Sequence, residues 1–186
     1  MNRKKFLKIA MPAVAIPLAG GWWINRHLSS HNGATRILSF KNLDEAMAET
    51  ERLQQASKVT LESEWTLYQN IIHCAQSIEF SISGFPEEKP EIFQRVIGKN
   101  VFRKFEMQGY MRHDRNEPIP GAPIIEPGGK IIEAFDRVKM AIRNFDAFTG
   151  KLRRHFAYGI LNKKEFSEAH CMHLADHYAI MNYPPA

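Results

Sequence analysis

The first 43 residues of this 186-residue chain contain no acidic side chain, although they contain seven basic ones. The formal net charge of the whole chain is +5, so the remainder carries a charge of −2. A nucleic-acid-binding domain needs a basic face on its folded part, and the body has only scattered basic pairs such as Arg153 and Arg154. The sequence therefore predicts no nucleic-acid partner, despite a pI of about 9.2.

The chain has only two cysteines, Cys74 and Cys171, and it lacks a paired-cysteine metal motif. It also lacks a glycine-rich phosphate loop and a Gly-x-Ser-x-Gly nucleophile motif. Two cysteines would suit one disulfide in an oxidising compartment. On helices, however, each cysteine would lie on a different face from the histidine beside it, so we expect both to be packing residues.

No segment shows the alternation of a long β-strand, and no internal repeat is visible. Helical spacing of apolar residues predicts helices over 42–57, 64–83, 90–110, 131–148 and 162–181, with a break or bend at Gly98. The segment 116–129 contains four prolines and three glycines and is predicted to be an irregular loop. The predicted fold class is all-α, a four-helix bundle with a long Pro/Gly-rich connection.

The N-terminus has the pattern of an export signal, because a basic stretch ending at Lys8 precedes a mostly apolar run over 9–24. It resembles a twin-arginine signal in which Lys4 replaces the second arginine. No small-x-small cleavage site follows the run, so an uncleaved segment that contacts the membrane is an alternative, as is a packed helix of a cytoplasmic protein.

The predicted organisation follows from these patterns. We expect a signal or anchor segment over 1–28, a linker over 29–37 and a helical domain over 38–183. The expected location is the periplasm, either as a released protein or as a membrane-anchored protein that faces the periplasm. The sequence leaves the oligomeric state open, and a dimer is among the states that it allows.

A pair of histidines in the last predicted helix is the most informative chemical pattern. His173 and His177 are four residues apart, which places their imidazoles on one helix face and one turn apart. This spacing presents two nitrogens to one divalent cation, although helix-face histidines also bond simply to water or carboxylates. Leu174 replaces the glutamate of a metalloprotease motif, which excludes that class. His170 lies within the same arc of the helix. It is a further ligand, a hydrogen-bonding neighbour of the ligands or a residue at the edge of the core.

His73 lies among apolar residues of the second predicted helix and is expected to point inward. If it meets the pair, the three imidazoles form a three-nitrogen site with an open position for water or substrate. The alternative is a core histidine with its own partner. Gln76, Glu79 and Asp176 are candidates for hydrogen bonds to the ligands.

Two other histidines have simpler interpretations. His113 lies in a charged stretch over 112–115, which predicts a solvated turn. His155 is expected to pack beneath Phe156 and Tyr158 instead of reaching the site.

The histidine in the second helix, the long central connection and the His-x-x-x-His pair resemble the DinB/YfiT-like superfamily of metal-binding four-helix bundles. The resemblance covers roughly 38–181. Four phrases look like an uncharacterised branch of that superfamily, whose members often have an exported leader. The phrases are WTLYQ (65–69), HCAQSIE (73–79), EPIPGAP (117–123) and HFAYG (155–159).

The resemblance implies that His73, His173 and His177 are metal ligands and that the ion is zinc or nickel. Some relatives are thiol-dependent transferases or isomerases, in which the metal activates a low-molecular-weight thiol. Many relatives have Arg-Gly-Gln after the last ligand, whereas residues 178–180 are Tyr-Ala-Ile here, so any role of that polar tail is absent.

Three functions are consistent with these patterns. The first is an exported metal-dependent hydrolase or thiol transferase that acts on a small molecule. The second is a non-enzymatic metal- or ligand-binding helical bundle of the cell envelope. The third is a metal-free anchored scaffold in which His73 does not meet the pair. The sequence does not identify a substrate.

Overall fold

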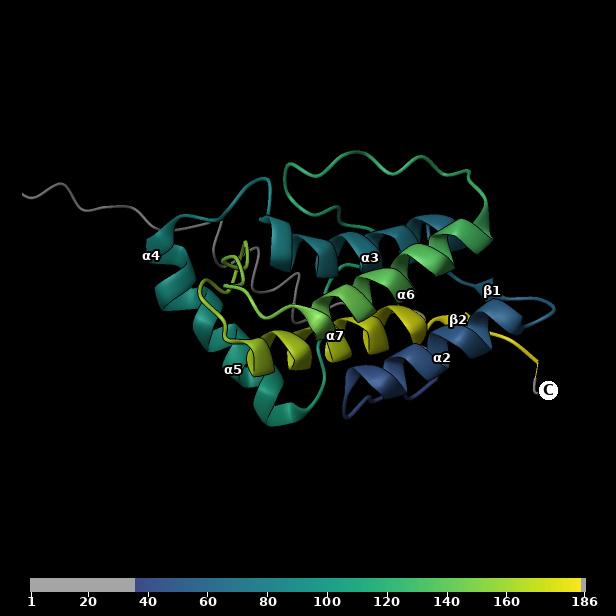
Figure 1. Ribbon diagram of the computed structural model, residues 1–186, viewed down its shortest axis with the longest axis horizontal. Helices are drawn as coiled ribbons and strands as arrows, with labels where there is room; N and C mark the ends of the chain where they lie inside the picture. The colour runs from purple at the N-terminus through teal and green to yellow at the C-terminus, as the bar shows by residue number, and fades with distance from the viewer. Residues whose placement is uncertain (1–35, 185–186) are drawn as a thin grey trace, which may run out of the picture.

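The computed structural model describes residues 36–184, and 54% of these residues lie in helices (Figure 1). The only sheet among them has two short strands, so the predicted all-α class is confirmed. The predicted leader and nearly all of the predicted linker lie outside the described residues. Within the described part of the chain, no helix is both long enough and apolar enough to cross a bilayer.

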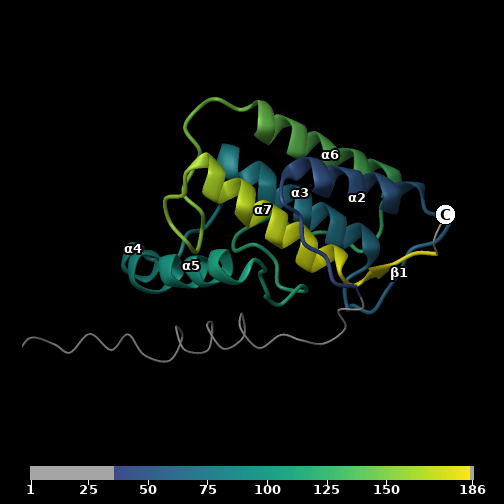
Figure 2. The same ribbon diagram turned by 90° about the horizontal axis from the view of Figure 1, so that it is seen from below.

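Four long helices run side by side (Figures 1 and 2). They are α2 (Leu43–Gln55), α3 (Leu67–Ser83), α6 (Ile131–Ala147) and α7 (Lys163–Tyr178). α3 packs against α6 and α7, and α2 packs against the same two helices. The core between them is formed by fully buried apolar side chains, which include Leu53, Ile71, Ile78, Phe145, Phe166 and Leu174.

Polar side chains cap the starts of three of these helices. The side chain of Asn42 accepts a hydrogen bond from the Glu45 backbone N–H at the start of α2. Thr66 and Gln69 form a capping box at the start of α3, which is why this helix begins three residues later than predicted. A second capping box, made by Asn162, fixes the start of α7. Each cap satisfies backbone donors that the first helical turn leaves free.

The predicted helix over 90–110 consists of α4 (Glu91–Phe93), a π-helical segment η1 (Gln94–Gly98) and α5 (Lys99–Gln108). The predicted irregularity at Gly98 is therefore a π-helical turn. A Cβ atom on Gly98 would lie 1.9 Å from the Ala157 carbonyl oxygen, so only glycine permits this close approach. α5 lies across one end of the four long helices, beside the segment that precedes α7 (Figure 2).

The last helix ends at Tyr178, earlier than the predicted end at 181. Met181–Asn182 instead form strand β2, which pairs antiparallel with β1 (Thr60–Leu61). These two short strands join the turn after α2 to the C-terminal end of the described chain.

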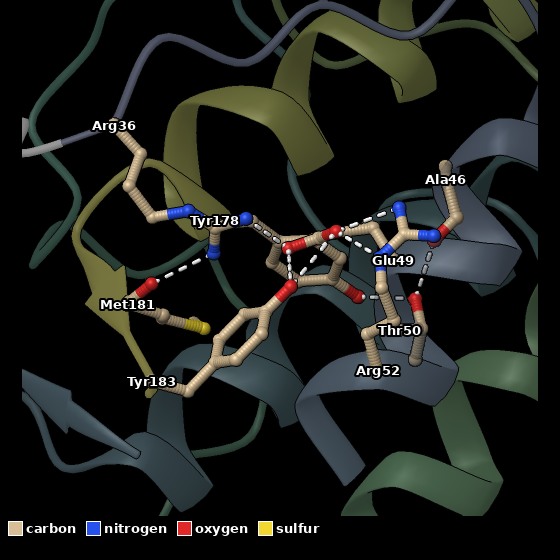
Figure 3. Close-up of polar contacts among 8 residues, drawn as sticks. All are labelled: Arg36, Ala46, Glu49, Thr50, Arg52, Tyr178, Met181 and Tyr183. Carbon is tan, nitrogen blue, oxygen red and sulfur yellow. Dashed lines mark hydrogen bonds and ion pairs between the residues drawn. The ribbon is translucent and has the colours of Figure 1, made fainter. Parts of the chain in front are cut away.

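A buried carboxylate fastens the start of the described chain to the C-terminal segment (Figure 3). Glu49 of α2 is only 2% exposed, and it pairs with the guanidinium groups of Arg36 and Arg52. The Tyr183 hydroxyl donates to the same carboxylate at 3.1 Å. Arg36 also donates to the Met181 carbonyl oxygen at 2.9 Å, so one ion cluster joins residues 36, 49 and 181–183.

Candidate metal centre

His173 and His177, the two predicted ligands on α7, point into the protein. His173 is 9% exposed and His177 is fully buried. The capping box at Asn162 fixes where α7 begins and therefore on which side of the helix both histidines lie. Their ring centroids are 4.7 Å apart. The predicted placement on one helix face is therefore correct, and this face packs against α3.

His73 of α3 meets this pair. Its Nε2 atom lies 3.3 Å from the His173 Nε2 atom, and its ring centroid lies 4.9 Å from that of His177. Trp65 packs edge-on against the His73 ring at 5.3 Å between centroids. The structure thus brings together the three histidines that the sequence singled out.

A fourth histidine joins them from the connection after α5. The His113 side chain is only 11% exposed, and its Nε2 atom lies 3.1 Å from the His177 Nε2 atom. The prediction of a solvated turn at His113 was wrong. The turn folds inward because Arg115 is itself buried and pairs with Asp176 of α7 at 2.8 Å.

The four imidazoles form a donor set suited to a metal ion. One ligand nitrogen from each of His73, His113, His173 and His177 lies within 4.8 Å of the other three. Two nitrogens that bind one zinc ion in a tetrahedron, each about 2.0–2.1 Å from it, are about 3.3–3.4 Å apart. The closest Nε2 pairs, at 3.3 and 3.1 Å, match that separation, so the histidines fit a metal that prefers nitrogen ligands.

The opposite ring nitrogens of two of these histidines have protein partners. His177 Nδ1 lies 2.9 Å from the Asn70 side-chain oxygen, and Asn70 donates from its amide nitrogen to the Thr66 carbonyl. His113 Nδ1 lies 3.2 Å from the Asp176 carboxylate. The Asn70 contact holds Nδ1 of His177 protonated and turns its Nε2 towards a metal, whereas the His113–Asp176 contact is one of distance between possible charges without hydrogen-bond geometry.

The sequence-based candidates for these contacts were only partly correct. Asp176 does contact a clustered histidine, although that histidine is His113 and not its neighbour His177. Glu79 instead pairs with Arg137 at 2.7 Å, and the Gln76 amide donates towards the Pro123 carbonyl at 3.5 Å. Asn70 was missed, although it lies one helical turn before the buried Cys74 and so on an inward face of α3.

Comparison with known proteins places the chain in a family. The family described as "Protein of unknown function (DUF1569)" matches residues 33–183. The chain belongs to the DUF1569 family. No curated protein and no solved structure matches it. All four clustered histidines of this DUF1569 protein lie inside the matched region.

Burial keeps the imidazoles of His73, His173 and His177 neutral. Removal from water, with the neighbouring His113 as the second cause, lowers the pKa of His73 to about 3. The pKa values of His173 and His177 are also lowered well below 6.5, first by burial and then by the other histidines. Neutral imidazole is the form that binds a metal, so protons do not compete for these nitrogens near neutral pH.

Neither cysteine of the DUF1569 chain contributes a thiolate. Cys74 and Cys171 are both free and buried. Burial raises the pKa of the Cys171 thiol to about 12, and it also raises that of Cys74. The expectation that both are packing residues agrees with this environment, and a reactive thiol at the cluster would have to come from another molecule.

A cavity opens beside the cluster. Its volume of about 60 Å³ is several times the roughly 10–15 Å³ that one water molecule needs by the same measure. His73, His113 and His173 line one part of it. His155 and His170 line another part, and His155 stacks on Tyr158 as expected, with ring centroids 4.2 Å apart. The histidine cluster is therefore open to a small molecule.

Asn70 provides a test of how the ligands are oriented. We expect Asn70→Leu to lower zinc affinity by about 10- to 100-fold, because His177 Nδ1 loses its acceptor. Asn70→Asp keeps an oxygen for His177 but loses the donor to Thr66, so it should retain more of the affinity than Asn70→Leu. Competition with a chromophoric zinc chelator measures this. Equal affinities for all three proteins would show that this contact does not orient the ligand.

His170 provides a test of acid sensitivity. It lies outside the cluster, edge-on to Phe145 and stacked on Phe166, and burial lowers its pKa to about 3. An unfolded histidine takes up a proton below about pH 6.5, whereas the folded one does so only near pH 3, so falling pH between these values favours unfolding. We expect metal-free His170→Asn to lose less stability than the parent between pH 6.5 and 4, by up to about 1.4 kcal/mol per pH unit. Urea unfolding at each pH measures the difference, and parallel pH curves would contradict it.

Proposed function

We propose that His73, His113, His173 and His177 bind one divalent metal ion, with zinc or nickel as the natural choices for imidazole ligands. The convergence of four imidazoles at the edge of a cavity carries the proposal. The arrangement of α2, α3, α6 and α7 also supports a four-helix bundle of the DinB/YfiT-like type, in which facing helices hold a metal in the core.

The activity that fits this site best is that of a metal-dependent hydrolase or thiol transferase acting on a small molecule. A divalent ion held by imidazoles lowers the pKa of a water or thiol and so supplies a nucleophile near neutral pH. The chain's own residues hold the imidazoles in place through Asn70 and Asp176 and keep bulk water away by burial. The cavity gives a reactant access to three of the four histidines.

A second function is supported by the number of ligands. Four protein nitrogens fill a tetrahedral sphere, which is typical of structural metal sites, whereas catalytic sites usually keep one position open. A non-enzymatic metal-binding protein of the cell envelope would have such a closed site. Cobalt substitution separates the two functions, because a small thiol added to an open site produces a thiolate-to-cobalt absorption band and a closed site gives no change.

Elemental analysis tests metal binding itself. The protein is purified without a histidine tag, loaded with zinc, passed through a desalting column and compared with His73→Ala, His177→Ala and the control His170→Asn. We expect about one zinc per chain in the parent and in His170→Asn, and strongly reduced zinc in the two alanine variants. Equal zinc in all four proteins would contradict the proposed site.

We propose further that the leader over 1–28 directs the protein to the periplasm or anchors it in the membrane facing that compartment. The basic stretch followed by an apolar run supports this location. Fractionation of cells expressing the full chain should place it in the periplasm or the membrane fraction. Recovery from the cytoplasm alone would contradict the proposal.

A further inference from the structure

We propose that the cavity beside the four histidines binds the carboxylate of a small organic acid. The inference rests on the proposed function, because metal binding at Nε2 determines where the remaining ring hydrogens lie. It goes beyond that function by naming the chemical class of the bound molecule and the residues that recognise it. Four observations carry it, and each concerns a side chain that lines the cavity.

The first observation is that two cluster histidines have donors without acceptors. If Nε2 of His73 and of His173 faces the metal, Nδ1 of each carries the hydrogen. Both Nδ1 atoms are buried and have no hydrogen-bond partner among residues 36–184, in contrast to His177, whose Nδ1 meets Asn70. A buried donor without an acceptor costs about 1–3 kcal/mol, so a slight turn of either ring that brings its closed-off Nδ1 to the cavity is favoured by a guest rich in acceptor oxygens.

The second observation is that the ring hydrogen of His155 is assigned to one nitrogen by its backbone contacts. Its Nδ1 accepts the backbone N–H groups of Ala157 and Tyr158 at 3.1 and 3.2 Å. The imidazole is neutral because burial lowers its pKa well below 6.5, so its single ring hydrogen is on Nε2. Stacking on Tyr158 holds the ring in place, which makes His155 a preoriented donor at the cavity wall.

The third observation is the polar atom of His170. This side chain is only 2% exposed, and its Nε2 atom has no hydrogen-bond partner in the described part of the chain. Phe145 and Phe166 pack against its ring, so apolar neighbours leave that nitrogen unsatisfied. His170 lines the cavity, and a slight turn of its ring towards a guest would supply the hydrogen bond that its closed-off Nε2 lacks.

The fourth observation is the charge at the cavity. Lys89 is half-buried and lines the cavity, and no ion pair joins it to any residue between 36 and 184. Its backbone N–H donates to the Phe156 carbonyl at 2.8 Å, which holds the residue beside the cavity. Glu117 is the only carboxylate among the lining residues, and its charge is opposite in sign to that of Lys89. An ammonium group and several neutral donors match a carboxylate better than a neutral group.

Apart from Ser77 and Tyr158, the remaining wall of the cavity is apolar. It receives side chains from Met111, Pro118, Ile119, Pro120 and Phe156. A guest with a carboxylate at one end and a short hydrocarbon body at the other therefore fits both halves of the lining. This combination favours a small organic acid over an inorganic anion.

Calorimetric titration with butyrate and with its neutral isostere butyramide tests the inference on zinc-loaded protein. We expect butyrate to bind at least 10-fold more tightly than butyramide. Lys89→Met should weaken butyrate binding by about 10-fold, whereas the exposed control Lys104→Met should leave it unchanged. Glu117→Gln should strengthen it, because a like charge is removed. Inorganic phosphate serves as a comparator that lacks a hydrocarbon body and should bind more weakly than butyrate.

Zinc content measured on the same samples separates this inference from the metal site. If the protein holds zinc but butyrate and butyramide bind equally, or Lys89→Met behaves like Lys104→Met, the carboxylate site is wrong and the metal site stands. If no zinc binds but Lys89→Met still weakens butyrate binding, the metal site is wrong, and the carboxylate site stands on Lys89 and His155 without the ring hydrogens that the metal would fix. Tighter binding of phosphate than of butyrate would contradict the organic-acid class.

Discussion

Replacing His113 with alanine should lower the zinc affinity of this protein by more than about 100-fold. Loss of a contact that only orients a ligand typically costs 10- to 100-fold, and removal of a nitrogen 3.1 Å from His177 Nε2 should cost more. The metal-free protein should also lose roughly 1–3 kcal/mol of stability, because the His113 ring is only 11% exposed and its removal leaves unfilled space. Chelator competition and urea unfolding measure the two effects separately.

Arg112→Ala is the matched control for this prediction. Arg112 lies in the same turn, its guanidinium packs over the Tyr110 ring at 5.1 Å, and it offers no metal ligand. We expect its zinc affinity to equal that of the parent. If His113→Ala also binds zinc as tightly as the parent, the site has only the three ligands that the sequence singled out, and His113 is a neighbour.

Replacing Glu49 with glutamine should lower the free energy of unfolding by about 2–3 kcal/mol. The glutamine keeps the shape of the side chain but leaves the guanidinium groups of Arg36 and Arg52 without their shared charge (Figure 3). Breaking a fully buried ion pair costs about 3–5 kcal/mol, and the estimate is lower here because the Arg52 and Arg36 side chains are 56% and 23% exposed. The arginines can therefore recover part of the loss from water.

Thermal unfolding of Glu49→Gln should show a midpoint roughly 5–10 °C below that of the parent. Glu51→Gln is the control, because Glu51 lies on the same helix. This substitution removes the same charge but breaks no ion pair among the described residues. Its midpoint should stay within about 2 °C of the parent. Equal midpoints for the two variants would show that the Glu49 cluster does not hold the two ends of the described chain together.

The positions of the long helices and of three clustered histidines could be predicted from local sequence patterns. The spacing of His173 and His177 determines their common face in any α-helix. The apolar surroundings of His73 correctly indicated an inward direction. That these three meet depends on how α3 packs against α7, and the sequence pointed to it only through the resemblance to a metal-binding superfamily.

His113 could not be predicted in the same way, because the path of an irregular connection depends on tertiary contacts. Its charged neighbours are typical of a solvated turn, yet Arg115 is buried by its pair with Asp176, which is 61 residues away in sequence. The early end of α7 has a similar origin, since Met181 pairs with Leu61 across the sheet instead of continuing the helix. Both features arise from partners that are distant in the sequence.

X-ray absorption spectroscopy of the zinc-loaded protein tests the central claim most directly, because it reports the atoms bound to the metal. We expect a first shell of nitrogen at about 2.0–2.1 Å, with the outer-shell scattering of several imidazole rings and no sulfur near 2.3 Å. In His113→Ala the imidazole contribution should fall by about one ring in four. A spectrum dominated by sulfur, or one without imidazole scattering, would contradict a metal centre built from His73, His113, His173 and His177.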